Sequence, residues 1–344
     1  MTAHPSEVLA DATAAPWIPA CDHYCGVHAR MIKSLALQQE LSQEFGACVF
    51  DVTLDLEDGA PVGGEKDHAQ MVAELALSAR QSAGPVVPRV AVRLHASDHP
   101  SFEQDAQIVL GQAGAALCHV MLPKVDTVEQ LENALATLAP HLQAAGANAL
   151  PVHILLESAR GISQVQALAA HPRVQSISFG LMDFVSSHGG AIPASAMTVS
   201  FESSGDALDQ FTHPLVLRAK LEIAAACHAF GKVPAHGVIT EFKRLDWVSL
   251  AAQRAAKHLG FTRMWSIHPD QIRPILAAMG PDRDEISLAS DILCAAHDAQ
   301  WAPIAVQGRL QDRASYRYFW QVLQRAYRTG RLAVSDPARA FFPH

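Results

Sequence analysis

Val152-His153-Ile154-Leu155-Leu156-Glu157 is a short apolar run that ends in an acid, and Val174-Gln175-Ser176-Ile177-Ser178-Phe179, followed by Gly180-Leu181-Met182-Asp183, repeats this pattern one helix later. Each run has the length of a strand that is buried on both faces. A carboxylate at the end of such a strand must be solvated, paired or bound to a metal. The two stretches therefore predict neighbouring parallel strands whose acids, Glu157 and Asp183, share one site for a hard cation.

The same alternation of a β-rich run and a helical pattern continues on both sides of these stretches. The expected strands are 17–20, 48–54, 89–95, 118–124, 152–156, 174–179, 235–239 and 263–268, and the expected helices between and after them are 28–45, 66–81, 102–112, 127–145, 162–170, 214–230 and 246–259. Eight repeats in about 265 residues predict an α/β fold of the (β/α)8 TIM barrel type. A doubly wound open sheet is the alternative. It usually has fewer units and a Gly-rich phosphate loop after its first strand, which this chain lacks.

The barrel is expected to occupy residues 16–280, with a different kind of segment on each side. Residues 1–15 show no apolar period and are expected to form a flexible N-terminal arm. Residues 281–344 are expected to form a C-terminal helical extension with helices over 285–299 and 314–328. This extension is too small for an independent core. It is therefore predicted to pack on the barrel or on a neighbouring subunit, as a lid or a subunit contact.

Composition narrows the class of protein. The chain has 344 residues, 49% of them apolar, and a formal charge of −8, which argues against nucleic acid or an anionic membrane surface as the main partner. Its first twenty residues lack the cationic start and apolar core of a secretory signal, and no apolar run approaches the roughly 18 residues of a membrane span. Six scattered cysteines indicate reduced thiols. A cytoplasmic protein acting on a small molecule is expected.

Charged residues follow several of the expected strands, and the carboxyl ends of barrel strands are where catalytic groups lie. They are Asp55, Glu57, Asp58, Arg93, His95, Lys124, Glu157, Asp183, His236 and His268. Acids supply oxygen ligands for Mg²⁺, and Arg93 could hold a substrate carboxylate through two parallel hydrogen bonds. A cation and a guanidinium facing one cavity suit a 2-oxo acid or its enolate. Single charges at strand ends are also ordinary solvated or paired termini, so the prediction depends on their coincidence at several ends.

Six motifs, read in order, resemble the citrate lyase β-subunit and malyl-CoA lyase group of the HpcH/HpaI aldolase superfamily. They are Asp55-Leu56-Glu57-Asp58-Gly59, Val92-Arg93-Leu94, Leu122-Pro123-Lys124-Val125, Leu156-Glu157-Ser158-Ala159-Arg160-Gly161, Phe179-Gly180-Leu181-Met182-Asp183 and Ile267-His268-Pro269-Asp270-Gln271-Ile272. The resemblance implies a (β/α)8 barrel that uses Mg²⁺, with Mn²⁺ as a substitute. It also implies reversible carbon–carbon cleavage of a 3-hydroxy acid or its CoA thioester through a metal-stabilised enolate, in a homo-oligomer, a trimer or a hexamer.

The resemblance also implies roles for individual residues. Glu157 and Asp183 would be the metal ligands, and Arg93 would hold the substrate carboxylate. Glu57 and Asp58 would belong to an acid cluster that orders water and the arginine.

Three further residues complete the expected site. Lys124 and His95 are expected to contact the substrate, together with Arg93 and Glu157. The segment Gly308-Arg309-Leu310-Gln311-Asp312 resembles a lid whose acid can enter the site of a neighbouring subunit, so Asp312 is expected to be a proton donor.

Other positions depart from the pattern of this superfamily. His95 replaces a common Asn, Gln70 an Arg, and His236 an Asp, and the chain has Thr262-Arg263-Met264-Trp265 where a Gly-Lys pair is frequent. The usual Arg-Ser pair of the first strand is also missing. The reaction type is therefore predicted, and the substrate stays open, including whether CoA is part of it. The alternatives are a free-acid class II aldolase that releases pyruvate or a related 2-oxo acid, and a non-catalytic accessory barrel.

Cys21, His23, Cys25 and His28 form a cluster of potential zinc ligands. Zinc sites generally combine ligands from two separated elements, whereas these four are interleaved in one short segment. A turn with two partly buried thiols is the expected structure. His188, in a Gly-rich loop after Asp183, is a further candidate base.

Overall fold

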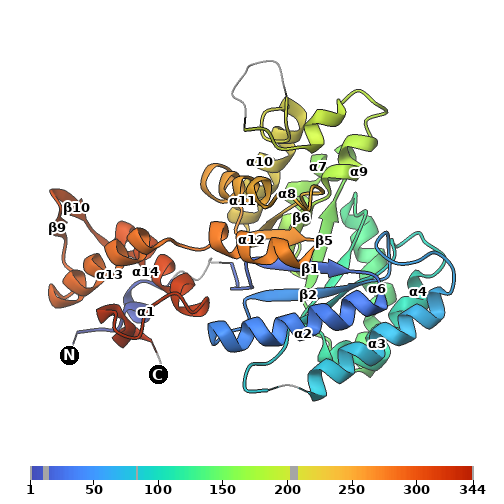
Figure 1. Cartoon of the computed structure of the whole chain (residues 1–344), viewed down its shortest axis with the longest axis horizontal. Coiled ribbons are helices and arrows are strands. Elements are labelled where there is room, and N and C mark those ends of the chain that lie inside the picture. Colours follow the sequence, from blue (N-terminus) through green and yellow to red (C-terminus); the bar gives the residue numbers. More distant parts are fainter. Residues whose placement is uncertain (1, 11–14, 83, 202–207, 343–344) are drawn as a thin grey trace.

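Eight parallel strands form a closed barrel in the computed structural model, which describes residues 2–10, 15–82, 84–201 and 208–342 (Figure 1). The strands are β1 (Cys21–Cys25), β2 (Phe50–Asp55), β3 (Val90–Arg93), β4 (Val120–Leu122), β5 (Val152–Leu156), β6 (Val174–Phe179), β7 (Val233–His236) and β8 (Arg263–Ser266). Each strand pairs with the next, and β1 pairs with β8 to close the ring. The predicted (β/α)8 fold is confirmed.

Helices surround this ring and cover its outer face. The longer ones are α2 (His28–Phe45), α3 (Glu65–Gln81), α6 (Val128–Ala144), α10 (Pro214–Ala229) and α11 (Leu245–Leu259), and the shorter ones are α4 (Phe102–Asp105), α5 (Gly111–Ala113), α7 (Ala159–Ser163), α8 (Val165–Ala170), α9 (Leu181–Ser186) and α12 (Ile272–Met279). Each long helix turns an apolar stripe towards the strands, and in α2 this stripe includes Met31 and Leu41. Thr127 caps α6 and Ser158 caps α7 through side-chain oxygens, which fixes where these helices begin.

The first strand does not lie where the sequence predicted it. It runs from Cys21 to Cys25 instead of over 17–20, because Pro19 lacks the N–H that a ladder of hydrogen bonds needs. Cys21 and Cys25 are buried in the core, and His23 Nδ1 lies 3.0 Å from Ser266 Oγ. The expected turn with partly buried thiols is therefore wrong, and Cys21, His23, Cys25 and His28 are not among the metal-ligating groups found in the described part of the chain.

The amino end of the barrel interior is closed by buried ion pairs. Arg263 Nη2 lies 2.6 Å from Asp22 Oδ2 and 2.7 Å from Asp51 Oδ2, and none of these three side chains is exposed. Arg89 Nε lies 2.5 Å from Asp51 Oδ1 and supplies a second positive charge. Two guanidinium groups thus balance two carboxylates, as buried charges require. This cluster of Asp22, Asp51, Arg89 and Arg263 is called the floor network below.

Apolar and aromatic side chains fill the barrel above the floor network. Tyr24 stacks on Trp265 with ring centroids 4.2 Å apart, and Met121 and Leu155 pack beside them. The Trp265 Nε1 group donates a hydrogen bond to Ser178 Oγ at 3.1 Å. The interior is therefore a packed core, and chemistry is confined to its two ends.

The C-terminal extension has a hydrophobic core of its own and lies to one side of the barrel (Figure 1). It contains α13 (Arg283–Asp298), the hairpin of β9 (Ile304–Val306) and β10 (Arg309–Gln311), α14 (Arg313–Arg328) and the 3-10 helix η5 (Pro337–Phe341). Its buried residues include Leu293, Tyr316, Trp320 and Leu323. The expectation that this segment is too small for a separate core is therefore wrong.

Part of the N-terminal segment belongs to that core. Residues Pro5–Val8 form helix α1, and Leu9 is only 2% exposed among the side chains of the extension. Trp301 Nε1 donates a hydrogen bond to the Ala3 carbonyl at 2.8 Å. The expected flexible arm is therefore wrong for this part, because a single turn of helix is too short to show an apolar period. Residues 11–14 lie outside the described residues.

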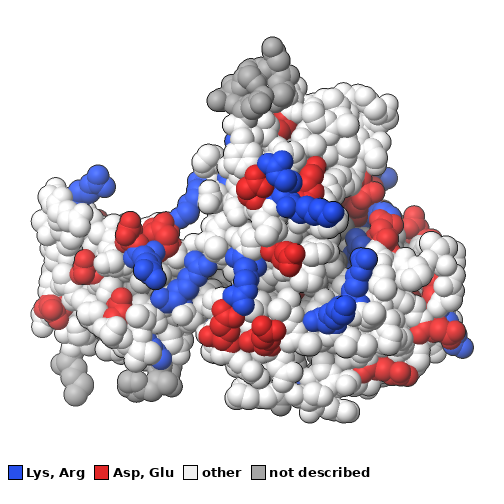
Figure 2. All heavy atoms as spheres, viewed as in Figure 1, with Lys and Arg blue, Asp and Glu red and all other residues white. Residues whose placement is uncertain are grey.

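Acidic and basic side chains are interspersed over the face of the molecule shown in Figure 2. In the described part of the chain, no helix combines the length and the apolar character needed to cross a membrane.

The floor network predicts a large cost for removing one charge. The Arg263→Met variant leaves two buried carboxylates with one guanidinium, and we expect it to lose about 3–5 kcal/mol of stability. The matched control is Arg273→Gln, which breaks the exposed pair with Glu44 and should change stability little. Urea unfolding measures both. A loss in Arg263→Met no larger than that in the control would contradict the prediction.

Candidate active site

The loop after β2 is built around Asp55. Its Oδ1 accepts a hydrogen bond from the backbone N–H of Glu57 at 3.0 Å, and its Oδ2 accepts one from Gly59 at 2.8 Å. A Cβ on Gly59 would lie 2.2 Å from Asp55 Oδ2, so only glycine fits there. The segment Asp55–Gly59 thus folds around the side chain of Asp55, and Glu57 and Asp58 lie at the rim of the barrel.

Arg93, the last residue of β3, is held by two of these acids. Its Nε lies 2.7 Å from Asp55 Oδ1 and its Nη2 lies 2.6 Å from Asp55 Oδ2, while Nη1 lies 3.1 Å from Glu57 Oε2. Burial opposes ionisation of the Asp55 carboxyl, but Arg93 outweighs it and lowers its pKa. The edge of the guanidinium that forms two parallel bonds is therefore used by Asp55. A substrate carboxylate would have to bind on the Nη1 side, beside Glu57.

Lys124 adds a second cation to the same acid. Its Nζ lies 2.5 Å from Glu57 Oε1 and 3.6 Å from Asp58 Oδ2. Partial burial would lower the pKa of Lys124, but Glu57 outweighs it and raises the pKa to about 12. The lysine is therefore charged and unsuited to a Schiff base. Its partner is Glu57, whereas the nearby Asp126 accepts a hydrogen bond from Ser158 at 2.5 Å.

Glu157 and Asp183 lie side by side, as the sequence predicted. Glu157 follows β5 and is 5% exposed, and Asp183 stands in the first turn of α9 after β6. Burial, the charge of Asp183 and a hydrogen bond between the two carboxyl groups raise the pKa of Glu157 to about 9. A Cβ on Gly180 would lie 2.7 Å from the Glu157 Cβ, so glycine is needed for this approach. Two adjacent carboxyl groups that hold a proton between them fit a cation, since a cation can replace the proton.

The ligand set at this pair favours a hard cation. Both side chains offer oxygen only, and Mg²⁺ commonly takes one or two carboxylates together with water and substrate oxygens. The backbone N–H of Lys124 donates to Glu157 Oε1 at 2.8 Å and orients that carboxylate. Lys124 is a non-glycine residue at a φ of +54°, a strained conformation that is common at functional sites. Glu157 and Asp183 are therefore the residues that would hold Mg²⁺, with Mn²⁺ as a substitute.

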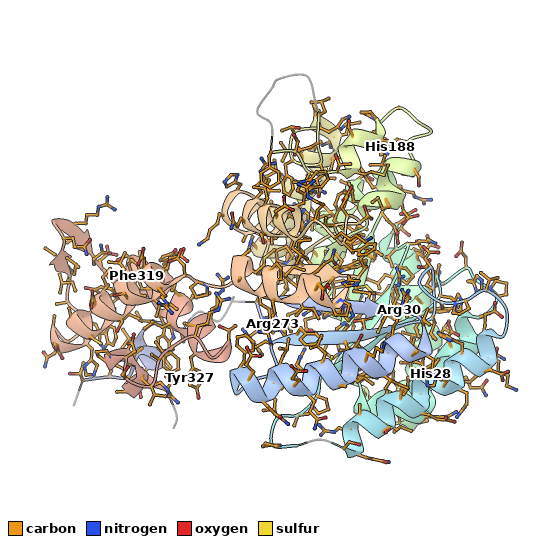
Figure 3. The ribbon with its side chains drawn as sticks, in the orientation of Figure 1. His28, Arg30, His188, Arg273, Phe319 and Tyr327 are labelled. Atoms are coloured by element: carbon orange, nitrogen blue, oxygen red, sulfur yellow. The ribbon has the colours of Figure 1, made fainter. Side chains whose placement is uncertain are left out.

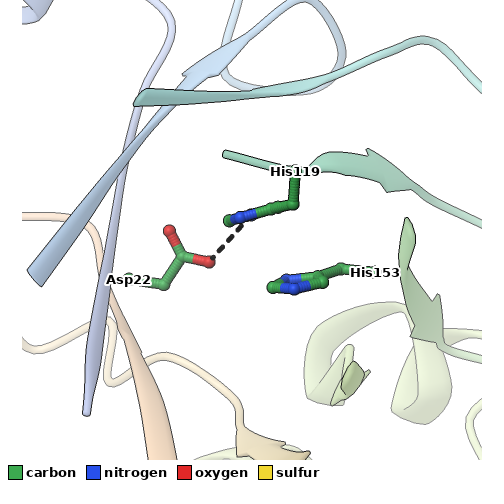
Figure 4. Close-up of side chains that lie close together, drawn as sticks. All are labelled: Asp22, His119 and His153. Atoms are coloured by element: carbon green, nitrogen blue, oxygen red, sulfur yellow. Dashed lines mark ion pairs between the residues drawn. The ribbon is translucent and has the colours of Figure 1, made fainter. Parts of the chain in front are cut away.

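Asp22, His119 and His153 form a second group with metal-ligating atoms, shown in Figure 4. His119 Nε2 lies 3.7 Å from Asp22 Oδ2, and the two imidazoles stack with centroids 3.6 Å apart. Arg263 lies against the same Asp22 and already supplies positive charge. Burial, followed by Arg263, lowers the pKa of His153 to about 3. The two imidazoles are therefore an uncharged lining beside Asp22 of the floor network, and a metal ion there would be repelled by the arginine.

His95 has a partner that the sequence did not reveal. Its Nδ1 donates to Asp105 Oδ2 at 2.6 Å, and its ring stacks on His99. Burial would lower the pKa of His95, but the hydrogen bond and charge of Asp105 outweigh it and raise the pKa above its usual value. Asp105 lies in α4 instead of at a strand end, so a search of strand ends could not find it. The sequence signal that could have identified Asp105 was an acid in the helix that follows β3.

Two other candidates lie outside this cluster. His188 follows α9, and its Nδ1 donates to the Phe184 carbonyl at 2.6 Å, so this nitrogen is already used (Figure 3). Asp312 caps α14 in the extension, where its Oδ1 accepts from the N–H of Ala314 at 2.9 Å. It does not reach the barrel rim of its own chain.

A recess of about 500 Å³ opens beside the site, between the loops after β3, β4 and β5. Its charged lining residues are Asp98, Asp126, Glu129 and Arg160. The recess therefore has more acids than cations.

The sequence pattern of the HpcH/HpaI aldolase/citrate lyase family matches residues 34–269 of this chain. The chain belongs to this family. It is 30% identical, over 83% of its length and 90% of the relative, to an L-malyl-CoA/β-methylmalyl-CoA lyase from Cereibacter sphaeroides. As a member of this family with lyases among its relatives, the chain is a carbon–carbon lyase, as the sequence predicted.

Solved structures agree with this assignment. A citrate lyase from Burkholderia xenovorans is 48% identical, with a TM-score of 0.82 over 99% of this chain and 100% of that one. The protein CitE from Mycobacterium tuberculosis, solved with magnesium, acetoacetate and coenzyme A, is 22% identical, with a TM-score of 0.62 over 90% of this chain and 98% of that one. The latter likeness shows the shared fold of the family.

The raised pKa of Glu157 predicts how Mg²⁺ binding depends on pH. Because this carboxyl stays protonated up to about pH 9 without a cation, Mg²⁺ must displace a proton when it binds. We expect the affinity for Mg²⁺ to rise about tenfold per pH unit between about pH 6 and 8. Calorimetry in buffers with different ionisation enthalpies should detect about one proton released per ion.

Variants locate that proton. Replacing the exposed Glu103 by Gln should leave proton release unchanged, whereas Glu157→Gln should abolish it together with Mg²⁺ binding. An affinity that does not change with pH would show that the two carboxylates do not hold a proton.

Proposed function

We propose that this protein is a Mg²⁺-dependent lyase that cleaves, or in reverse forms, a carbon–carbon bond of a 3-hydroxy acid or its CoA thioester through an enolate. The observation that carries the proposal is the Glu157–Asp183 pair, which lies at the same rim as two buried or half-buried cations. The 30% identical relative, named as an L-malyl-CoA/β-methylmalyl-CoA lyase, supports the thioester form of the substrate.

Cleavage of a 3-hydroxy acid breaks the bond between its second and third carbons. The hydroxyl proton leaves, a carbonyl forms at the third carbon, and the bonding electrons remain on the second carbon as an enolate, which then takes up a proton. A cation held by Glu157 and Asp183 would stabilise the negative charge that develops on oxygen. The other residues of the site have to orient the substrate and move two protons.

Arg93 and Lys124 place charged hydrogen-bond donors at fixed positions for a substrate carboxylate. Both contact Glu57, at 3.1 Å and 2.5 Å, so this acid determines where the two cations stand. Glu57 and Asp55 are therefore positioning residues. Asp58 is the more exposed acid, and burial and the charge of Glu57 raise its pKa. We assign Asp58 the role of ordering water at the open side of the site.

We further propose a homo-oligomer, a trimer or a hexamer, in which Asp312 of one subunit donates a proton in the site of another. Support comes from the position of Asp312 at an exposed turn of the extension, away from its own barrel rim. The substrate is a small molecule, and we place the reaction in the cytoplasm.

A free-acid aldolase that releases pyruvate or a related 2-oxo acid is the second candidate. Two observations favour it over a CoA ester. The recess beside the site carries three acids and one arginine, which is unfavourable for the phosphates of CoA. In addition, Arg263 lies in the segment where this superfamily frequently has a Gly-Lys pair, but it is fully buried in the floor network and cannot reach a ligand. A non-catalytic accessory barrel remains as the outcome of a failed activity test.

Variants of the carboxylate pair test the metal-dependent function. We expect Glu157→Gln and Asp183→Asn each to abolish Mg²⁺ binding in calorimetry and to lower kcat by at least about 1,000-fold, because the developing charge loses its counter-ion. The thermal midpoint should not fall, since an amide of the same shape can keep the hydrogen bond between the two side chains without a shared proton. Glu103→Gln is the exposed control. Full Mg²⁺ binding in both variants would overturn the metal assignment.

A substrate panel separates the two candidates. Malyl-type CoA thioesters and the corresponding free hydroxy acids are compared in one carbon–carbon cleavage assay with Mg²⁺. Turnover of thioesters alone supports the first candidate, and turnover of free acids alone supports the second. If Mg²⁺ and a 2-oxo acid bind but no member of the panel reacts, both candidates are contradicted and the accessory role is favoured.

A further inference from the structure

A cavity of about 510 Å³ lies at the end of the barrel opposite the candidate active site. Its barrel side is formed near the amino ends of β1, β2, β7 and β8, and its other side by α14 and the segment after it. The packed interior of Tyr24, Trp265 and their neighbours separates it from the carboxylate pair. Figure 3 labels Arg273 on the barrel side of this junction and Tyr327 on the extension side.

The charge of this cavity is opposite to that of the whole chain. The protein carries −8, yet the lining includes Lys232, Arg325, Arg328 and Arg331 and has no Asp or Glu among its described residues. Figure 2 shows Lys and Arg side chains where the extension meets the barrel, with Asp and Glu side chains beside them on the outer surface. Four cations facing one cavity without a carboxylate create a positive potential that attracts anions.

Two of the arginines are fixed by backbone carbonyl groups. Arg331 donates from Nη1 to Pro281 at 3.0 Å and from Nη2 to Leu276 at 2.6 Å, and Arg325 donates from Nη2 to Met279. Carbonyl groups orient a guanidinium but do not neutralise it. Glu285 acts on Arg325 but is itself paired with Lys257. Burial outweighs this acid and lowers the pKa of Arg325, so its positive charge is held in place and only weakly balanced.

Among the four cations of the lining, Arg328 is the one most available to bind a ligand. Its guanidinium lies 5.7 Å from the centre of the Trp17 ring, and within the described ranges no carboxylate or hydrogen-bond acceptor contacts it. Burial without an acidic partner lowers its pKa. On the barrel side, Lys232 lines the same cavity and donates one hydrogen bond, to the His171 carbonyl at 3.1 Å. An anion between Arg328 and Lys232 would receive charge-assisted hydrogen bonds from both.

Much of the remaining wall of the cavity is apolar and includes Trp17, Ile18, Phe45 and Val49, and its uncharged polar members are His228, Thr262, Gln321, Gln324 and Thr329. Its volume falls within the roughly 300–1,000 Å³ of small-molecule sites, which combine an apolar wall with a few placed polar groups. A bare phosphate would leave that wall unused. The fitting ligand has phosphate groups for the cations and a flat, mostly apolar body for the wall.

We propose that this cavity is a second binding site, for a nucleotide-like ligand whose phosphates contact Arg328 and Lys232. Because one wall belongs to the barrel and the other to the extension, the ligand contacts both and fixes their relative position. The site does not depend on the metal or the lyase reaction. It would act as a regulatory site, through the extension that carries Asp312.

Binding of ADP and of inorganic pyrophosphate to the full chain tests the proposal. Calorimetry is done without Mg²⁺ and with EDTA, so that a cation at Glu157 and Asp183 cannot recruit phosphate. We expect ADP to bind saturably at one site per chain and to raise the thermal midpoint. Pyrophosphate should bind at least about tenfold more weakly, because it lacks the apolar body. Arg328→Gln should weaken ADP binding at least about tenfold.

Matched variants keep the test independent of folding and of the lyase site. Arg309→Gln, which alters an exposed arginine on β10, and Glu157→Gln should both bind ADP like the original chain. Lys232→Gln repeats the test from the barrel side, and circular dichroism verifies that each variant folds. No saturable ADP binding below about 1 mM, or unchanged affinity in folded Arg328→Gln and Lys232→Gln, would overturn the proposal. Equal affinity for pyrophosphate and ADP would overturn the nucleotide-like class.

Discussion

Eight parallel strands that close into a barrel bring all their carboxyl ends to one rim and all their amino ends to the other. The interior between the rims must be filled at the density of a protein core. Here Tyr24, Met121, Leu155 and Trp265 fill the middle, and buried ion pairs of Arg263 close the amino end. Because nothing can pass through this core, each rim has its own chemistry.

At the carboxyl rim, electrostatic pairing leaves one group of charges unbalanced. Arg93 is paired with Asp55, and Lys124 with Glu57, so these cations and acids neutralise one another. Glu157 has Asp183 as its carboxyl neighbour, and its contact with Lys124 is through the backbone N–H. A buried carboxylate beside another carboxylate is stable only with a proton or a cation between them. This imbalance, more than any single residue, is what makes the rim a candidate metal site.

The sequence predicted regular elements well where their pattern was long or apolar. Helix His28–Phe45 and strands Val152–Leu156 and Val174–Phe179 begin and end where they were expected. The juxtaposition of Glu157 and Asp183 follows from parallel topology alone, so it too could be predicted. The strand Cys21–Cys25 could not, because Asp22 and His23 are polar and become buried only when Arg263, more than 200 residues away, pairs with Asp22. In the same way, the docking of Leu9 depends on partners from the far end of the chain.

Sequence patterns also could not predict which side chains pair with one another. Arg93 was expected to be free to bind a substrate carboxylate, yet one edge of its guanidinium binds Asp55. The two residues are partners in the register of β2 and β3. Asp105 was missed because it approaches His95 from a helix. The sequence shows which residues follow a strand and so reach a rim. It does not show which acid each cation pairs with, and that pairing determines the geometry of the site.

The most direct test of the metal site is a crystal of this protein grown with Mn²⁺, with data collected at the manganese absorption edge. Manganese replaces magnesium at oxygen sites, and its anomalous signal changes across an absorption edge that protein atoms lack. A single anomalous peak between the carboxylates of Glu157 and Asp183 is the predicted result. A peak at Asp22, His119 and His153, or none at the rim, would contradict the assignment of the carboxylate pair.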